Sequence, residues 1–241
     1  MALAALAAFV GAFVQSATGF GFALVLSPAL FAVLEPVEAV TTLLALGLAL
    51  NLLVLFEHGR PEHVNWRRLV PVLMAAVPGL AVGLVALAQL SKEALQVTVG
   101  VAVILAAAWQ LLRRSRPARP PTGSGWVVGF VSGALTTSIS VSGPPIVLWL
   151  EARGMPPKEF RASLAASFLA LNLAGGALLL AAEGPDVLEV GTILPLLVVV
   201  LAGHLLGALA FRRFDRERFF IAVLVLVGVT GLASIAAGLA G

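Results

Sequence analysis

The stretch TTSISVSGPP, residues 136–145, interrupts a chain that is apolar over most of its length. It places five hydroxyl side chains, a glycine and two prolines inside an apolar run. Within a bilayer an unpaired backbone group costs several kcal/mol, so non-helical backbone is tolerated only where it is buried in protein or lines a cavity. The stretch therefore predicts a broken helix at a binding site inside a membrane.

The composition predicts a polytopic membrane protein of the all-α fold class. Of the 241 residues, 60% are hydrophobic and 11% are charged, against about 25% charged in soluble domains. The net charge is +3, but the arginines stand in short loops between apolar runs, as membrane topology requires, so nucleic acid is not an expected partner. The chain has no cysteine, which excludes disulfides, and we expect no cofactor and no metal site.

Six apolar runs approach the roughly 20 residues needed to span a bilayer. They cover residues 38–56, 69–90, 94–112, 162–182, 191–211 and 219–240. Two further stretches, 2–34 and 126–150, are interrupted, the first by TGFGF at 18–22. Each arm of the first stretch has about 14 residues, or roughly 20 Å of helix, which is short of the roughly 30 Å hydrocarbon core. Each interrupted stretch is either one broken span or a hairpin that returns to its own side.

The distribution of Lys and Arg favours hairpins. If residues 126–150 cross the membrane once, seven basic residues lie on one side and eight on the other. If they fold back, fourteen lie on one side and only Lys92 lies on the other. Because basic residues concentrate in cytoplasmic loops, we expect a re-entrant hairpin, cytoplasmic Arg-rich loops and an external C-terminus. By analogy, residues 2–34 form a second hairpin that enters from the opposite face.

The two halves of the chain are related by an internal repeat. PVEAVTTLLALGLALNL (36–52) and PKEFRASLAASFLALNL (157–173) are identical at nine of seventeen positions. We predict one membrane domain with a first repeat over 1–118, a second over 119–241 and an Arg/Pro linker at 113–121. Each repeat holds one hairpin and three spans, an odd number of crossings, so the second repeat is inverted relative to the first. Inverted repeats with broken helices near the midplane are a recurring plan of transporters.

The two hairpin tips carry the candidate binding residues. After each break a short helix begins, near Phe22 and near Pro144, and its free N–H groups carry about half a positive charge that attracts anions. Hydroxyls and glycines surround these helix starts. The candidates are Thr18, Gly19, Gly21, Thr136, Thr137, Ser138, Ser140, Ser142, Gly143 and Pro144. Alternatively, each hydroxyl only satisfies the broken backbone, as is common in membrane helices.

Three further polar residues lie inside predicted spans. Asn51 and Asn172 occupy matching positions of the two repeats, and each amide either braces a hairpin or contacts the ligand. His204 is the ionisable side chain that lies well inside a predicted span, which makes it a candidate for proton coupling, although it could equally serve packing. No acidic or basic residue stands near a predicted midplane, so an anion held by helix N-termini suits this chain better than a cation.

Paired glycines and tryptophans complete the pattern. Gly79/Gly83 and Gly203/Gly207 are GxxxG pairs at matching positions, which favours close helix packing and leaves a homodimer open. The four tryptophans stand near predicted span ends, where we expect them to anchor the protein at the membrane interface. They are Trp66, Trp109, Trp126 and Trp149.

Two segments resemble a known family. GAFVQSATGFGFALVLSPAL (11–30) and GFVSGALTTSISVSGPPIVLWL (129–150) are similar to the paired glycine- and proline-containing segments of the sulfite exporter TauE/SafE family, also known as the 4-toluene sulfonate uptake permeases. The resemblance implies a permease of the cytoplasmic membrane for sulfite, sulfoacetate or other organosulfonates. It also implies that Thr18, Gly19, Gly21, Gly143 and Pro144 lie near the substrate path. The second hairpin has fewer glycines than the family pattern, a difference that bears on substrate choice.

These observations favour a transporter of small sulfur-containing anions, with the lipid bilayer as the surrounding partner. Two alternatives remain at the level of sequence. An intramembrane serine hydrolase would use Ser140 or Ser142 as the nucleophile and His204 as its base, because a hydroxyl nucleophile needs a base within hydrogen-bond reach. A non-transporting membrane subunit would use the same fold without binding an anion.

Overall fold

The structure, a computed structural model, describes residues 1–56, 63–113, 124–210 and 216–240. These ranges contain helices and no strands. In chain order the elements are α1 (Ala2–Thr18), α2 (Phe22–Val33), α3 (Pro36–Phe56), α4 (Trp66–Gln89), α5 (Lys92–Arg113), α6 (Gly125–Ile139), α7 (Gly143–Glu151), α8 (Pro157–Glu183), the 3-10 helix η1 (Pro185–Val187), α9 (Val190–Ala210) and α10 (Arg216–Ala240). The linker predicted at 113–121 lies outside the described residues, apart from its first position.

The predicted spans are present as helices. Five of them, α3, α4, α5, α8 and α9, are long and apolar enough to cross a membrane. The sixth predicted span, 219–240, falls within α10 (Arg216–Ala240). Most of the helices begin a few residues earlier than predicted, because each starts with a polar or proline-containing turn that the apolar pattern does not include.

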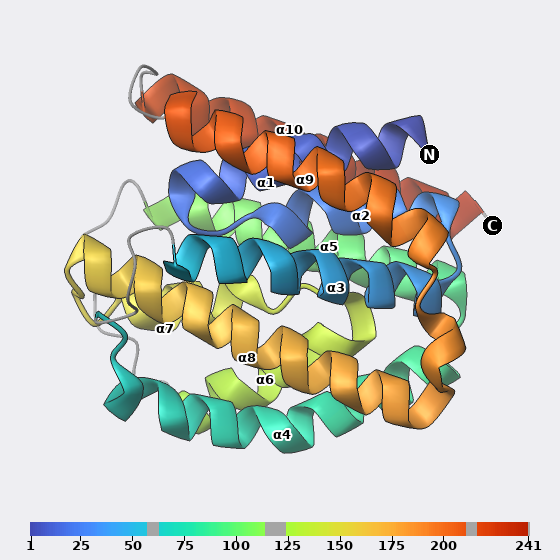
Figure 1. Ribbon diagram of the computed structural model, residues 1–241, viewed down its shortest axis with the longest axis horizontal. Helices are drawn as coiled ribbons and strands as arrows, with labels where there is room; N and C mark the ends of the chain where they lie inside the picture. Colours follow the sequence, from blue (N-terminus) through green and yellow to red (C-terminus); the bar gives the residue numbers. More distant parts are fainter. Residues whose placement is uncertain (57–62, 114–123, 211–215, 241) are drawn as a thin grey trace.

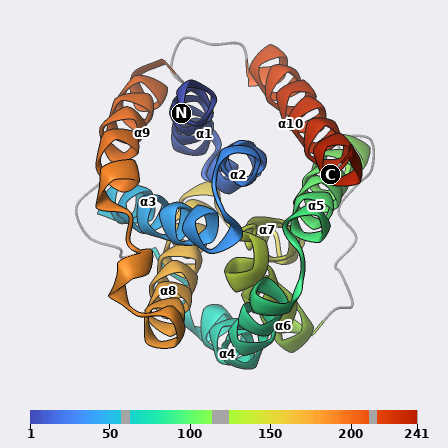
Figure 2. The same ribbon diagram turned by 90° about the vertical axis from the view of Figure 1, so that its right-hand side faces the viewer.

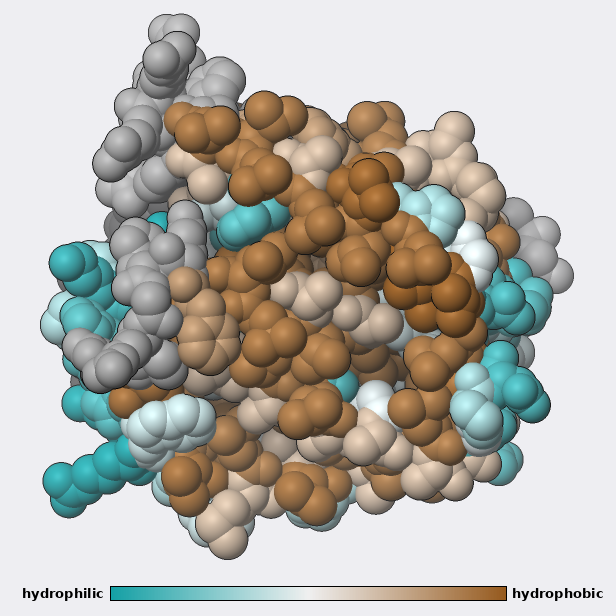
Figure 3. Space-filling model, viewed as in Figure 1, coloured by the Kyte–Doolittle hydropathy of each residue, from teal (hydrophilic) through white to brown (hydrophobic). Residues whose placement is uncertain are grey.

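The surface is suited to a bilayer. Figure 3 shows a broad hydrophobic band between two ends where hydrophilic residues gather. Large apolar side chains are exposed on the described helices, among them Val198 at 67%, Leu209 at 70% and Leu105 at 64%. In water such a surface would drive aggregation, whereas lipid tails solvate it. The chain is therefore a multi-pass membrane protein.

Both predicted helix breaks are present. The chain leaves helical geometry between Thr18 and Phe22 and again between Ile139 and Gly143. Helix α7 returns along α6, since a Cβ on Gly125, the first residue of α6, would lie 3.0 Å from the Trp149 ring near the end of α7. Figure 1 shows the open ends of the α1–α2 pair and of the α6–α7 pair at opposite ends of the molecule.

The GxxxG pairs pack helices together within the chain. Cβ atoms on Gly79 and Gly83 of α4 would press into the backbone carbonyls of Phe130 and Ala134 in α6. In the same way, Gly203 and Gly207 of α9 lie against the carbonyls of Phe9 and Phe13 in α1. The prediction of close helix packing is confirmed, and these glycine faces are covered by the chain itself.

Two further helix pairs complete the bundle. Helix α5 packs closely on α10, where Gly100 lies against the Gly231 carbonyl, and α3 packs on α8. Figure 2, which looks along the helices, shows α2, α3 and α7 surrounded by the remaining helices. The two breaks thus lie inside the bundle, where buried leucines and phenylalanines of α2, α3, α7 and α8 exclude lipid.

The prediction for the tryptophans is wrong at one position. Trp66, Trp109 and Trp126 are exposed near helix ends, as expected of interface anchors. Trp149 is only 5% exposed. It is buried because it closes the open end of the α6–α7 pair, with the Arg153 guanidinium 3.5 Å above its ring.

Candidate functional site

The two breaks begin with the same backbone geometry and end differently, since Gly21, before α2, has φ of 114° and Ser142, before α7, has φ of −75°. Gly19 ends α1 and Ser140 ends α6, both in the left-handed region, with φ of 92° and 58°. Two residues further on, Gly21 precedes α2 and Ser142 precedes α7. Among the described residues Ser140 is the one non-glycine residue with a positive φ, a conformation that costs an L-residue roughly 1–2 kcal/mol.

A cavity of about 40 Å³ lies between the breaks. Its lining comes from both breaks and from α1, α2, α3, α7 and α8: Gln15, Phe20, Gly21, Phe22, Ala23, Leu24, Leu43, Gly47, Asn51, Ser140, Val141, Ser142, Gly143, Phe168 and Asn172. Six predicted site residues meet here: Gly21, Asn51, Ser140, Ser142, Gly143 and Asn172. The cavity therefore joins two regions that are more than 100 positions apart in the sequence.

Backbone donors come mainly from α2. The N–H groups of Phe22, Ala23 and Leu24, in the first turn of α2, form no backbone hydrogen bond within the described chain. In the first turn of α7, two of the corresponding residues are Pro144 and Pro145, which have no N–H. The two helix starts were expected to contribute alike, but α2 presents more free donors than α7.

The two asparagines differ in what they contact. Asn51 is buried and engaged at both polar atoms: its Oδ1 accepts a hydrogen bond from Gln15 Nε2 at 2.9 Å, and its Nδ2 donates to the Gly47 carbonyl at 2.7 Å. Asn172 is half-buried and makes no side-chain hydrogen bond with any residue that the structure describes. The bracing alternative thus fits Asn51, and the ligand-contact alternative fits Asn172.

The hydroxyls also fall into two groups, those that are hydrogen-bonded within the protein and those that are not. Ser140 and Ser142 line the cavity, are 7% and 6% exposed, and form no side-chain hydrogen bond within the described ranges. Thr136 and Ser138 donate to the carbonyls of Ser132 and Ala134, one turn back in α6, each at 2.7 Å. These two hydroxyls satisfy backbone rather than face the cavity.

Thr18 and its neighbour Gly19 lie beside the cavity and are absent from its lining. The Thr18 hydroxyl is engaged with the Val14 and Phe20 carbonyls, at 2.9 and 2.6 Å. Pro144 faces a different groove, between α5 and α7.

One side-chain hydrogen bond ties each hairpin to a neighbouring helix. Ser16 Oγ of α1 donates to the His204 carbonyl of α9 at 3.0 Å. Thr137 Oγ1 of α6 donates to the Leu80 carbonyl of α4 at 2.7 Å. His204, 6% exposed, therefore lies beside α1 and is not among the residues that line the cavity with Ser140 and Ser142, so the geometry gives the serine-hydrolase alternative no support.

Sequence reasoning missed two contacts at the tips. Arg161, at the start of α8, donates from Nη2 to the Ser16 carbonyl at 3.0 Å, and its side chain covers Gly19. Ser27 of α2 donates to the Ile139 carbonyl at 3.0 Å. Both contacts satisfy carbonyls at the C-terminal ends of the broken helices, where the helix dipole is negative. A basic side chain thus reaches one hairpin tip.

A multi-pass helical protein that encloses a polar cavity between two helix breaks has the architecture of a membrane transport protein. The chain belongs to the sulfite exporter TauE/SafE family, whose model matches residues 3–234. A relative from Cupriavidus necator, named "Probable sulfite/organosulfonate exporter TauE", is 30% identical over 160 residues, which is 64% of this chain and 62% of the relative. The match thus spans less than two thirds of that relative's length. No solved structure matches the chain.

Membership in this family confirms the resemblance found in the sequence. The members of this family are transporters rather than enzymes.

Proposed function

We propose that the protein carries a small sulfur oxyanion across the cell membrane and holds it in the cavity between the two helix breaks. The observation that carries this proposal is the set of donors around the cavity: the free N–H groups at the start of α2, the hydroxyls of Ser140 and Ser142, and the amide of Asn172. Sulfite and sulfonate oxygens are acceptors only, so they complement these groups. Unpaired buried donors cost about 1–3 kcal/mol each, which an anion would recover.

The size of the cavity favours a compact substrate in this conformation. A water molecule needs roughly 10–15 Å³ of such volume, so the cavity of about 40 Å³ holds a few water-sized groups. Phe22 and Phe168 bound it on apolar sides. We therefore rank sulfite first and place sulfoacetate and larger organosulfonates after it, since these require the cavity to widen.

Two inverted repeats, residues 1–118 and 119–241, build this site in our proposal. Several matched contacts support the repeat: the left-handed Gly19 and Ser140, the bonds of Ser16 and Thr137 to the neighbouring helix, and the glycine-lined α9–α1 and α4–α6 interfaces. The opposite placement of the open hairpin ends in Figure 1 is also what inversion requires. In the membrane, we place the Arg-rich loops in the cytoplasm and the C-terminus outside.

The candidate residues take different roles under this proposal. Gly21, Ser140, Ser142, Gly143 and Asn172 contact the anion. Residues that satisfy or shape the backbone around it are Thr18, Gly19, Asn51, Thr136, Thr137, Ser138 and Pro144. His204 is our candidate for proton coupling, because it is a buried ionisable residue of α9 whose backbone carbonyl accepts a hydrogen bond from Ser16, next to Gln15 of the cavity. A His204→Gln variant that keeps exchange of sulfite but loses its dependence on a pH gradient would support that role.

Flux into proteoliposomes tests the function. Purified protein reconstituted in vesicles should move labelled sulfite with saturable kinetics, and unlabelled sulfite should compete better than sulfoacetate or acetate. Transport that does not saturate, or that fails for every sulfur oxyanion and sulfonate, would remove the proposal.

A further inference from the structure

The helices α5 and α10 pack against the first hairpin, and a groove separates α5 from α7 of the second hairpin. Helix α2 packs against both α5 and α10. The space between the tip of α1–α2 and these helices is a crevice of only about 20 Å³. Helix α7, in contrast, faces α5 across an apolar groove of about 670 Å³. In Figure 2 the α5–α10 pair lies along one side of the molecule, within reach of both α2 and α7.

The groove and the crevice each lie beside one hairpin, and two of their lining positions match in the repeat. The crevice is lined by Val14 and Leu24 of the first hairpin. The groove is lined by Leu135 and Pro145, which occupy the matching positions of the second hairpin when Gly19 is aligned with Ser140. The spaces beside the two hairpins thus differ more than tenfold in volume, so the first hairpin is closed against the α5–α10 pair and the second is open.

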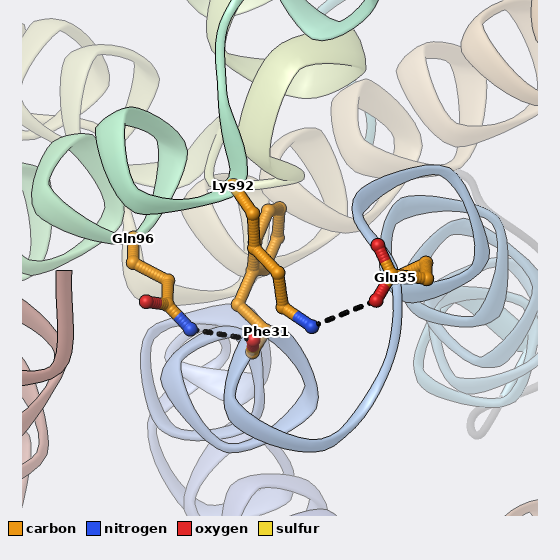
Figure 4. Close-up of polar contacts among 4 residues, drawn as sticks. All are labelled: Phe31, Glu35, Lys92 and Gln96. Atoms are coloured by element: carbon orange, nitrogen blue, oxygen red, sulfur yellow. Dashed lines mark hydrogen bonds and ion pairs between the residues drawn. The ribbon is translucent and has the colours of Figure 1, made fainter. Parts of the chain in front are cut away.

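Polar contacts hold the closed side. Figure 4 shows Lys92 and Gln96 of α5 pointing to the end of α2. Gln96 Nε2 donates to the Phe31 carbonyl at 2.8 Å, and Lys92 Nζ lies 3.0 Å from Glu35 Oε1. Gln96 is only 8% exposed, and its own carbonyl accepts a hydrogen bond from Ser234 of α10 at 2.8 Å. We call Phe31, Glu35, Lys92 and Gln96 the latch.

The latch is absent from the second repeat at the level of sequence. When Gly79 is aligned with Gly203, the position that matches Gln96 is Phe220, which has no side-chain donor. When Gly19 is aligned with Ser140, the position that matches Glu35 is Pro156, which has no carboxylate. The second hairpin therefore lacks the means to hold the α5–α10 pair by the same contacts. An imbalance of this kind makes one conformation the resting state.

We propose that the α5–α10 pair rocks between α2 and α7, and that the latch keeps it against α2 in the resting protein. Close packing at Gly100 and Gly231 and the Ser234–Gln96 hydrogen bond make α5 and α10 move together. In the second conformation α5 lies against α7, the groove closes and the crevice beside the α1–α2 tip opens. This inference rests on the proposed function for its purpose, but its geometry is measurable without any substrate.

Cross-linking in vesicles tests the movement, since the chain has no cysteine of its own. One pair, Leu24→Cys with Ala107→Cys, spans the crevice, and another, Leu105→Cys with Leu148→Cys, spans the groove. A short membrane-permeant bifunctional thiol reagent reports how often each gap is closed. We expect Gln96→Leu to slow cross-linking at the crevice and speed it at the groove, because losing one hydrogen bond shifts an equilibrium by roughly fivefold.

Ser91→Ala is the matched control, because the Ser91 hydroxyl accepts a hydrogen bond from the Ala94 N–H at the exposed start of α5 itself. It should leave both rates unchanged. If Gln96→Leu does not fold, Glu35→Gln, on the surface, decides the question with an expected shift of about twofold. Rates that stay unchanged, or that change at the crevice alone, would overturn the proposal. All reactions are run without sulfite, so a failure of sulfite transport leaves this result standing.

Discussion

Ser140 adopts the same left-handed backbone as Gly19, with φ of 58° against 92°, at the matching end of the second broken helix. This backbone conformation is strained for serine and unstrained for glycine. At Ser140 the strain accompanies a hydroxyl that lines the cavity and has no other partner among the described residues. Strained residues are retained where the surroundings give them a task, and we propose that the task here is a hydrogen bond to the substrate.

Replacing Ser140 with glycine should separate stability from binding. Ser140→Gly relieves the backbone, so we expect the free energy of unfolding to stay constant or rise by up to about 1 kcal/mol. Sulfite affinity should fall about fivefold through the lost hydroxyl. Thermal unfolding in detergent and equilibrium binding measure the two effects. The control Gly19→Ala, at φ of 92° and against Arg161, should lower stability; unchanged affinity in Ser140→Gly would remove the hydroxyl from the site.

The two asparagines should respond in opposite ways to the same substitution. Asn51→Leu breaks bonds to Gln15 and Gly47 and leaves a buried amide unpaired, so we expect a loss of about 2–3 kcal/mol in stability. Asn172→Leu should cost less than about 1 kcal/mol and should weaken sulfite binding. Unfolding and binding assays on both variants distinguish the roles. Equal loss of stability in the two would contradict the assignment.

Thr137 and Ser142 offer a similar contrast within the second hairpin. Thr137→Val removes the donor to the Leu80 carbonyl, so the α6–α4 contact should weaken by about 1–2 kcal/mol while affinity for sulfite stays unchanged. Ser142→Ala should reduce affinity and leave the melting temperature without ligand unchanged. Weaker binding by a fully stable Thr137→Val protein would show that this hydroxyl faces the anion.

The packing around two glycines predicts that the same substitution, glycine to alanine, lowers stability in α4 and raises it in α8. A Cβ at Gly83 would meet the Ala134 carbonyl and the Thr137 hydroxyl, so Gly83→Ala should destabilise the protein by about 1–3 kcal/mol. A Cβ at Gly176 of α8 meets nothing within 4 Å, so Gly176→Ala should stabilise it by about 0.5–1 kcal/mol. Thermal unfolding of both variants checks the α4–α6 interface, and tolerance of Gly83→Ala would refute its close approach.

The sequence predicted the helix breaks and the spans well, because both depend on local chemistry. Hydroxyls, glycines and prolines in an apolar run have few explanations in a bilayer, and span length follows from its thickness. Thus TGFGF at 18–22 and the stretch at 136–145 each fall at an observed break. Which cavity-side groups are free could not be predicted in this way, since Thr136 and Ser140 look alike in the sequence and differ only in the contacts around them.

The other features that the sequence did not predict arise from long side chains and from differences between the two repeats. Arg161 stands in a basic loop region, and the sequence gives no sign that its guanidinium reaches Ser16. Trp149 stands near a span end and is buried only because α7 returns against Gly125. The repeat suggested equal halves, whereas Pro144 and Pro145 remove donors from the second helix start. Tertiary placement decides each of these features.

Binding of labelled sulfite to the purified protein tests the central claim most directly, because it asks whether an anion lies between the two breaks. We predict saturable binding by the wild-type chain and an affinity at least about tenfold lower when Ser142→Ala and Asn172→Leu are combined, with the fold intact. Saturable binding that the double variant retains at full affinity would contradict the account.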